Sequence, residues 1–127
     1  MIIADTHAWV WWHASPKKLS ARARAALGTS SEIGLCAISC WEIATLVARK
    51  RLSFDRDVLL WLKQSLSTSQ AMLIPLDPDI AVACSQLKWN HSDPADRLIV
   101  ASAVIHRAQI VTKDERIRSF RQVQSIW

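Results

Sequence analysis

Short apolar runs alternate with helix-like patterns along the whole chain, and this alternation restricts the possible folds more than any other feature. The runs that predict strands are Ile2–Ala4, Glu32–Ile38, Ala71–Leu76, Gln109–Thr112 and Val123–Ile126. Short apolar strands that are separated by helices predict parallel pairing, with helices on both faces of the sheet. We therefore expect an α/β fold with a central, mostly parallel sheet of four to five strands.

The segments between these runs carry the start signals and periodicities of helices. Asp77-Pro78 and Asp93-Pro94 each combine an N-cap with a proline in the first turn. Ser39 is followed three residues later by Glu42, which predicts a capping box at another helix start. The expected helices are Thr6–His13, residues 19–27, Ser39 to about Arg51, residues 58–66, residues 78–87, Asp93 to about His106 and Asp114–Phe120.

Length and composition indicate an ordinary globular protein. The chain has 127 residues, and half of them are hydrophobic, which suits one domain over residues 1–127. The longest apolar stretch, Leu98–Ile105, is far shorter than the roughly 20 residues that cross a membrane. We see no secretory leader and expect a soluble, cytoplasmic protein. Cys36, Cys40 and Cys84 lack a paired spacing, which favours small buried side chains over disulfides or a zinc site.

The charge of the chain favours polyanionic partners. There are 16 basic and 11 acidic residues, and the formal net charge is +5. If four of the 11 acids gather in one site, seven remain against 16 basic residues elsewhere. Such a surface attracts polyanions, nucleic acid above all. A basic but inert surface is the alternative.

Carboxylates stand where the predicted strands end. Asp5 follows the first strand, Asp114 follows the fourth, and Glu42 lies near the end of the second. The carboxyl ends of parallel strands share one edge of a sheet, which is where ligands bind in such folds. Asp96 falls in the first turn of the helix that opens with Asp93, on the side of its apolar positions. We therefore expect Asp5, Glu42, Asp96 and Asp114 to meet at this edge.

Each of these acids also has an ordinary structural interpretation. Asp5, Asp93 and Asp114 are suited to cap the helices that follow them. Glu42 belongs to the capping box, and the helix dipole stabilises a carboxylate at the position of Asp96. Capping and a functional role both stay open at this point.

Four carboxylates in one place require a counter-charge. A close pair repels by about 4 kcal/mol at an effective dielectric constant of roughly 20. Protonation, a bound cation, or Arg97 or Lys113 would relieve this repulsion. Ligands made only of carboxylate oxygen suit Mg²⁺ or Mn²⁺.

Our mechanistic hypothesis is a metal-activated hydrolysis of phosphodiester bonds. Asp5, Asp96 and Asp114 hold one or two ions, and Glu42 is a further ligand or the base. Thr6 and Thr112 hydrogen-bond the phosphate or orient a ligand, and their alternative is an ordinary turn hydroxyl. Asp93 is a secondary candidate beside its capping role.

Four segments, in this order, resemble the PIN-domain family, and they are most similar to its VapC branch of toxin ribonucleases. These segments are Asp5-Thr6-His7, Ser39-Cys40-Trp41-Glu42-Ile43-Ala44, His91-Ser92-Asp93-Pro94-Ala95-Asp96-Arg97 and Thr112-Lys113-Asp114. The resemblance covers essentially the whole chain, and none of the four acidic positions departs from the family pattern.

The resemblance implies a three-layer α/β/α sandwich and an endoribonuclease that depends on Mg²⁺ or Mn²⁺. It implies that the family's acidic residues fall on Asp5, Glu42, Asp96 and Asp114. It also implies a homodimer, and a small antitoxin that inserts a segment into the active-site groove. The expected role is the toxin of a type II toxin–antitoxin pair that cleaves RNA.

Other functions fit less well or remain as alternatives. A phosphatase with an aspartate nucleophile needs a second aspartate two residues after Asp5, where His7 stands. A nucleotide-binding oxidoreductase needs a glycine-rich phosphate loop, which the sequence lacks. A non-catalytic RNA- or antitoxin-binding module, with the acids serving only as caps, remains open. We expect Trp9 and Trp12 in the core and Trp11 at a partner surface. For His91 we expect a loop hydrogen bond, with contact to the site as the alternative.

Overall fold

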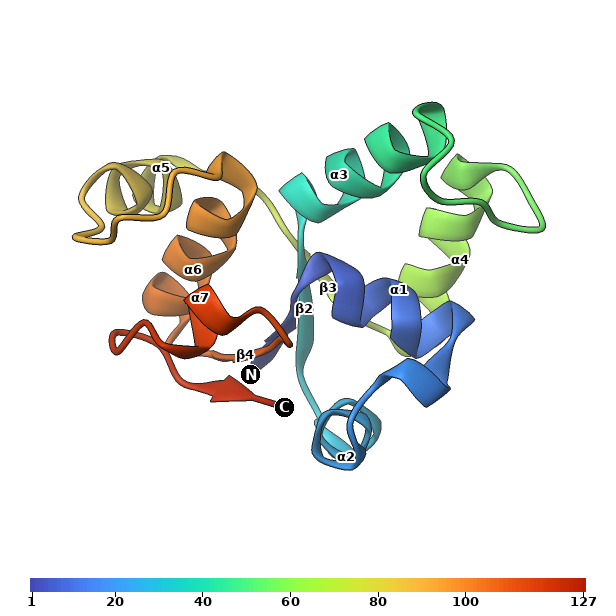
Figure 1. Cartoon of the computed structure of the whole chain (residues 1–127), viewed down its shortest axis with the longest axis horizontal. Coiled ribbons are helices and arrows are strands. Elements are labelled where there is room, and N and C mark those ends of the chain that lie inside the picture. Colours follow the sequence, from blue (N-terminus) through green and yellow to red (C-terminus); the bar gives the residue numbers. More distant parts are fainter.

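The computed structural model describes residues 1–127 and has a fully parallel, five-stranded sheet between two groups of helices (Figure 1). The sheet order is β3-β2-β1-β4-β5. The predicted α/β sandwich and its mostly parallel sheet are confirmed. The strands are β1 (Ile2–Ala4), β2 (Ile33–Cys36), β3 (Met72–Ile74), β4 (Gln109–Val111) and β5 (Ser125–Ile126).

All expected helices form, and a short 3₁₀ turn, η1 (Pro16–Lys18), follows the first of them. None of the helices combines the length and the apolar character that crossing a membrane requires. The α-helices are α1 (Thr6–Ala14), α2 (Ala21–Thr29), α3 (Ala37–Ala48), α4 (Val58–Ser69), α5 (Pro78–Ser85), α6 (Pro94–His106) and α7 (Glu115–Arg118).

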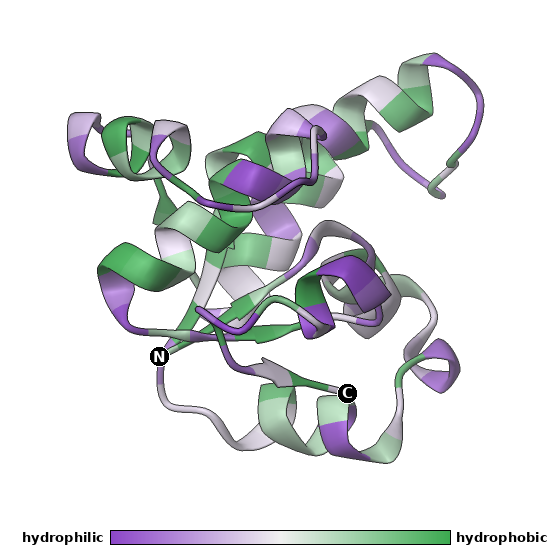
Figure 2. Cartoon of the chain, turned by 60° about the vertical axis from the view of Figure 1, so that its left-hand side comes forward, coloured by the Kyte–Doolittle hydropathy of each residue, from purple (hydrophilic) through white to green (hydrophobic).

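Successive residues of a strand face opposite sides of the sheet, and this builds two separate cores. Ile2 packs with Trp9 and Trp61 on the side of α1, α2 and α4. Ile3 packs with Ile99 on the side of α5, α6 and α7. Figure 2 shows the corresponding concentration of hydrophobic segments in the strands and adjoining helices, with hydrophilic loops outside. Trp9 is fully buried, and Trp12 is half-buried against the first core.

The central strand sets the position of the site. β1 pairs with β2 and β4 in register, so that Ala4 lies opposite Leu35 and Val111. The residues that follow these three strands therefore emerge together at the carboxyl edge of the sheet. The edge strands β3 and β5 are shorter than predicted.

The second strand ends earlier than predicted, and the predicted capping box is wrong. Cys36 is the N-cap of α3 and makes no side-chain capping bond. Ser39 lies inside the first turn, fully buried, and its hydroxyl bonds Thr6 rather than a helix amide. Contact with the β1–α1 junction therefore replaces the local cap, and it leaves the Glu42 side chain free for the pocket.

Candidate active site

Asp5 joins β1 to α1 and is almost completely buried, with 3% of its surface exposed. Its Oδ1 accepts the backbone N–H of Thr6 at 2.8 Å, which caps α1. Its Oδ2 accepts the Thr112 hydroxyl at 2.6 Å, and Nδ1 of His7 lies 3.4 Å from the same oxygen. The capping interpretation is therefore correct, and capping leaves this carboxylate at the mouth of the core.

Thr6 connects the first acid to the second. Its hydroxyl donates to Oε1 of Glu42 at 2.5 Å and lies 2.9 Å from the Ser39 hydroxyl. Glu42 projects from the second turn of α3. Thr6 thus orients a carboxylate 36 positions away in the sequence.

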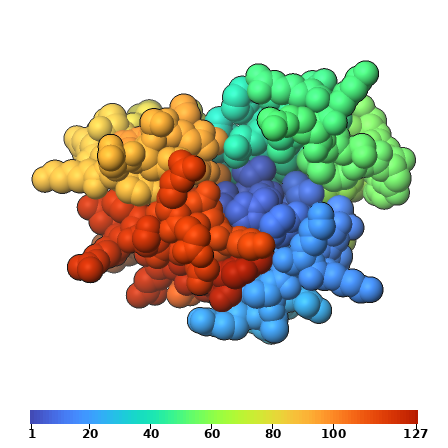
Figure 3. Space-filling view, viewed as in Figure 1, coloured from blue at the N-terminus to red at the C-terminus, as the bar shows by residue number.

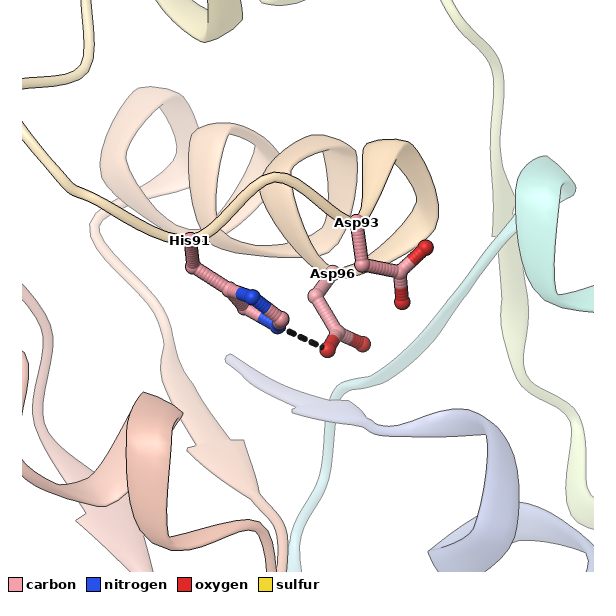
Figure 4. A group of neighbouring side chains, drawn as sticks. All are labelled: His91, Asp93 and Asp96. Carbon is pink, nitrogen blue, oxygen red and sulfur yellow. Dashed lines mark hydrogen bonds and ion pairs between the residues drawn. The ribbon is translucent and has the colours of Figure 1, made fainter.

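Asp96 stands in the first turn of α6, as the Asp93-Pro94 start signal predicts. Asp93 caps the helix through the N–H of Ala95, at 3.4 Å. The Oδ2 of Asp96 lies 2.6 Å from Nε2 of His91. Ligand atoms of His91, Asp93 and Asp96 lie within 4.8 Å of one another, and Figure 4 shows the imidazole turned toward Asp96.

Asp114 caps α7, because its Oδ1 accepts the N–H of Arg116 at 2.8 Å. Its own N–H donates to the Thr112 hydroxyl at 3.0 Å. Thr112 therefore links Asp114 to Asp5 across the ends of β4 and β1.

All four acids line one pocket of about 260 Å³, so the expected convergence is observed. In Figure 3 the dark-blue atoms from the start of the chain are recessed between the orange-red, yellow-orange and teal segments. Asp93 and Thr112 are not among the lining residues. The lining residues are Asp5, Thr6, His7, Val10, Trp11, Glu42, Leu46, Arg51, Leu52, Asp96 and Asp114.

Burial and mutual repulsion raise the pKa of two of these carboxyl groups. Burial chiefly raises the pKa of Asp96 to about 7; the hydrogen bond with His91 opposes the rise, and the charges of Asp5, Asp93 and Asp114 add to it. Burial also raises the pKa of Glu42, against the hydrogen bond from Thr6 and with the repulsion of Asp5 and Asp93. Both directions reflect chiefly the burial of a carboxylate and, to a lesser extent, the neighbouring negative charges.

The basic side chains considered as counter-charges are engaged elsewhere. Arg97 donates to the backbone carbonyls of Trp89, His91, Cys84 and Leu87. The Nζ of Lys113 lies 5.9 Å from the ring centre of Trp11. No lysine or arginine is paired with any of the four acids. Neutralisation by Arg97 or Lys113 is therefore wrong, and the all-carboxylate set fits a hard divalent cation.

Sequence reasoning gave one side chain of the site only as an alternative and missed another. His91 contacts Asp96, five positions away, so the alternative of a contact with the site is correct. Arg116 contacts Nδ1 of His91 at 3.1 Å. Nothing in the local pattern around Arg116 signals this contact, because it depends on how α7 packs beside the loop that precedes α6.

The fold and the acidic pocket define an α/β protein with a carboxylate centre at the carboxyl edge of its sheet. Residues 2–123 match the family model of the PIN domain. The chain is 35% identical over 126 residues to Ribonuclease VapC22 of Mycobacterium tuberculosis, covering 98% of this chain and 95% of the relative. It belongs to the PIN-domain family and, within it, to the VapC ribonucleases.

Solved structures of similar shape agree with this fold. The FitAcB structure from Neisseria gonorrhoeae has a TM-score of 0.70 at 22% identity, over 98% of this chain and 96% of that one. A toxin–antitoxin complex from Klebsiella pneumoniae has a TM-score of 0.68 at 18% identity, over 97% and 95%. At these identities the likeness concerns the fold alone.

Proposed function

We propose that this chain is a metal-dependent endoribonuclease, the toxin of a type II toxin–antitoxin pair, with residues 1–127 acting as one nuclease domain. The observation that carries the proposal is the gathering of four carboxylates in one pocket, none of them paired with a lysine or an arginine. The kinship with a VapC ribonuclease supports it. A ligand set of carboxylate oxygens favours Mg²⁺ or Mn²⁺ over zinc or copper.

The contacts within the pocket suggest a role for each acid. Asp5, Asp96 and Asp114 would hold the ion, and Glu42 would serve as a further ligand or as the base that takes the proton of the attacking water. When bound, the ion would supply an activated water and a positive charge beside the scissile phosphate. The hydroxyls of Thr6 and Thr112 are directed at Glu42 and Asp5, which favours orientation of these acids over contact with phosphate.

The rest of the pocket suits a nucleic acid. Val10, Trp11, Leu46 and Leu52 form apolar lining beside the acids, and Arg51 adds a positive charge. A guanidinium attracts phosphate, and an aromatic or apolar surface accepts a nucleobase. An inserted antitoxin segment would occupy the same groove and block the substrate.

A cleavage assay with a charge-matched control tests the proposal. The purified protein is incubated with a mixed RNA pool in Mg²⁺, in Mn²⁺ and in EDTA, beside Asp5→Asn and Asp55→Asn. Asparagine at position 5 can still cap α1 but loses the ligand charge, so we expect cleavage to fall at least ~100-fold. Asp55 is exposed outside the pocket, so Asp55→Asn should cleave normally. Cleavage in EDTA, or by Asp5→Asn at the normal rate, would refute the mechanism.

A non-catalytic RNA- or antitoxin-binding module is the second candidate. It is favoured by the fact that Asp5, Asp93 and Asp114 each cap a helix. Metal binding separates the two, because an ion that binds only the folded site stabilises it by about 2.7 kcal/mol at a concentration of 100 Kd. A rise in melting temperature with Mg²⁺ or Mn²⁺ supports the nuclease, and an unchanged melting temperature supports the module.

The homodimer is also part of the proposal. Trp41 on α3 is 62% exposed and Leu76 before α5 is 56% exposed. Ile38, one turn before Trp41, lines a shallow pocket together with Leu76 and Leu98. Exposed apolar side chains gathered in this way mark an interaction surface, and we assign this surface to a second copy of the chain.

A further inference from the structure

His91 is held beside the acidic pocket without lining it. Its side chain is 5% exposed, and its Nε2 lies 2.6 Å from Oδ2 of Asp96. Its Nδ1 lies 3.1 Å from Nη1 of Arg116. The ring of Trp89 packs edge-on at 4.8 Å between centroids. Both ring nitrogens therefore have a polar partner, and the ring plane is confined by an aromatic neighbour.

The contact of Arg116 with Nδ1 determines which ring nitrogen of His91 carries the hydrogen. A guanidinium can only donate hydrogen bonds, so Nδ1 of His91 must accept from Arg116. A neutral imidazole that accepts at Nδ1 carries its hydrogen at Nε2. That hydrogen is directed at Oδ2 of Asp96. The second oxygen, Oδ1, has no hydrogen-bond partner in the protein.

We propose that His91 and Arg116 form a positioning pair for Asp96. Arg116 sets the imidazole tautomer, and the imidazole N–H holds one carboxylate oxygen so that the other is presented to the divalent ion. The inference rests on the proposed function, because it takes Asp96 as a metal ligand. Neither ring nitrogen has a lone pair free for an ion, so His91 acts through Asp96 despite its place in the cluster of Figure 4.

The origin of Arg116 explains how the pair is assembled. Asp114 caps α7 by accepting the N–H of Arg116 at 2.8 Å. The capping bond of Asp114, which lines the pocket, therefore also anchors Arg116, whose side chain contacts His91. Through α7, the positions of Asp114 and Asp96 are therefore linked, although they lie on different elements.

The first test is made on the metal-free protein. Nitrogen-15 NMR of the imidazole rings should report the Nε2–H tautomer for His91, with its signals assigned by their loss in His91→Gln. Arg116→Met should shift the ring away from that tautomer. Arg118→Met is the control, because it removes the same charge from the same short helix and Arg118 pairs only with Glu115. This variant should leave the tautomer of His91 unchanged. An Nδ1–H ring in the native chain, or no change in Arg116→Met, would overturn the proposal.

The second test measures Mn²⁺ binding by electron paramagnetic resonance. His91→Leu should weaken Mn²⁺ affinity roughly 10–100-fold. His91→Gln should retain most of it, because its amide offers an N–H to Asp96 and a carbonyl to Arg116. Equal affinities in all three proteins would refute the positioning role.

Spin-echo modulation of the Mn²⁺-loaded native protein should show no directly coordinated nitrogen from His91. Because His7 also lines the pocket, the same measurement is made on His91→Gln, and a nitrogen signal of the native protein that disappears in this variant would make His91 a ligand and overturn the proposal. If the native chain bound no Mn²⁺, the proposed function would fail and the positioning role with it. The NMR result would then still report separately on the contact between Arg116 and His91.

Discussion

Individual aspartates in this protein both cap a helix and line the acidic pocket, two roles that the sequence alone presents as alternatives. Asp5 caps α1 through Oδ1 and binds the Thr112 hydroxyl through Oδ2. Asp114 likewise caps α7 while lining the acidic pocket. The two roles are compatible because a carboxylate has two oxygens and about four lone pairs, and a cap uses only part of them. A cap that follows a parallel strand is thereby brought to the edge where ligands bind.

Asp96 should couple the stability of the metal-free protein to pH. Its pKa is about 7 in the folded chain against an ordinary 3.8, so between these values the folded state keeps a proton that the unfolded state releases. The contribution of this group to the free energy of unfolding is complete below pH 3.8 and is lost as the pH rises through about 7. The raised pKa of Glu42 acts in the same direction.

Urea unfolding in EDTA across this pH range checks the prediction. Asp96→Asn removes the titrating group, so its free energy of unfolding should fall less steeply with pH than that of the native chain. Saturating Mg²⁺ should oppose the fall, since the ion binds the deprotonated carboxylates. Parallel pH profiles for the native and Asp96→Asn proteins would contradict the assignment.

At the scale of elements, the close contact of β2 with β3 depends on a glycine. A Cβ atom at Gly34 would lie 2.6 Å from Cδ1 of Ile74, which is itself buried in the second core. Gly34→Ala should therefore destabilise the protein by about 1–3 kcal/mol, the usual cost of overpacking. Gly28 on α2 is the matched control, because a Cβ atom there meets nothing within 4 Å.

Chemical denaturation compares the two alanine variants directly. Gly28→Ala should stabilise the protein by about 0.5–1 kcal/mol, because it removes a flexible residue from a helix. Gly34→Ala should show the opposite sign. Equal shifts in the two variants would mean that Ile74 repacks without cost.

At the scale of the whole molecule, the surface around Trp41 is the contact that we propose for a homodimer. Trp41→Glu places a charge on this surface and should halve the mass measured by light scattering after size-exclusion chromatography. Leu59 on α4 is 57% exposed and does not line the pocket of Ile38 and Leu76, so Leu59→Glu should leave the mass unchanged. A Trp41→Glu protein that keeps the native mass would place the interface elsewhere.

The order of strands and helices, the helix starts at Asp77-Pro78 and Asp93-Pro94, and the convergence of the four acids were predictable from local features of the chain. Apolar runs, proline and capping residues act over a few neighbouring positions, so their effects can be predicted from the sequence. The parallel sheet followed from their alternation, and the carboxyl-edge position of Asp5, Glu42 and Asp114 followed from the sheet.

Contacts between distant segments were decided only by the tertiary packing. The Thr112–Asp5 bond joins residues 107 positions apart, and the contact between Arg116 and His91 joins residues 25 apart. The failure of the Ser39 cap has the same cause, since Ser39 found a better partner in Thr6, 33 positions away. Local propensity does not determine which helices and strands pack against one another in the two cores. This packing determined the hydrogen bonds around the acids.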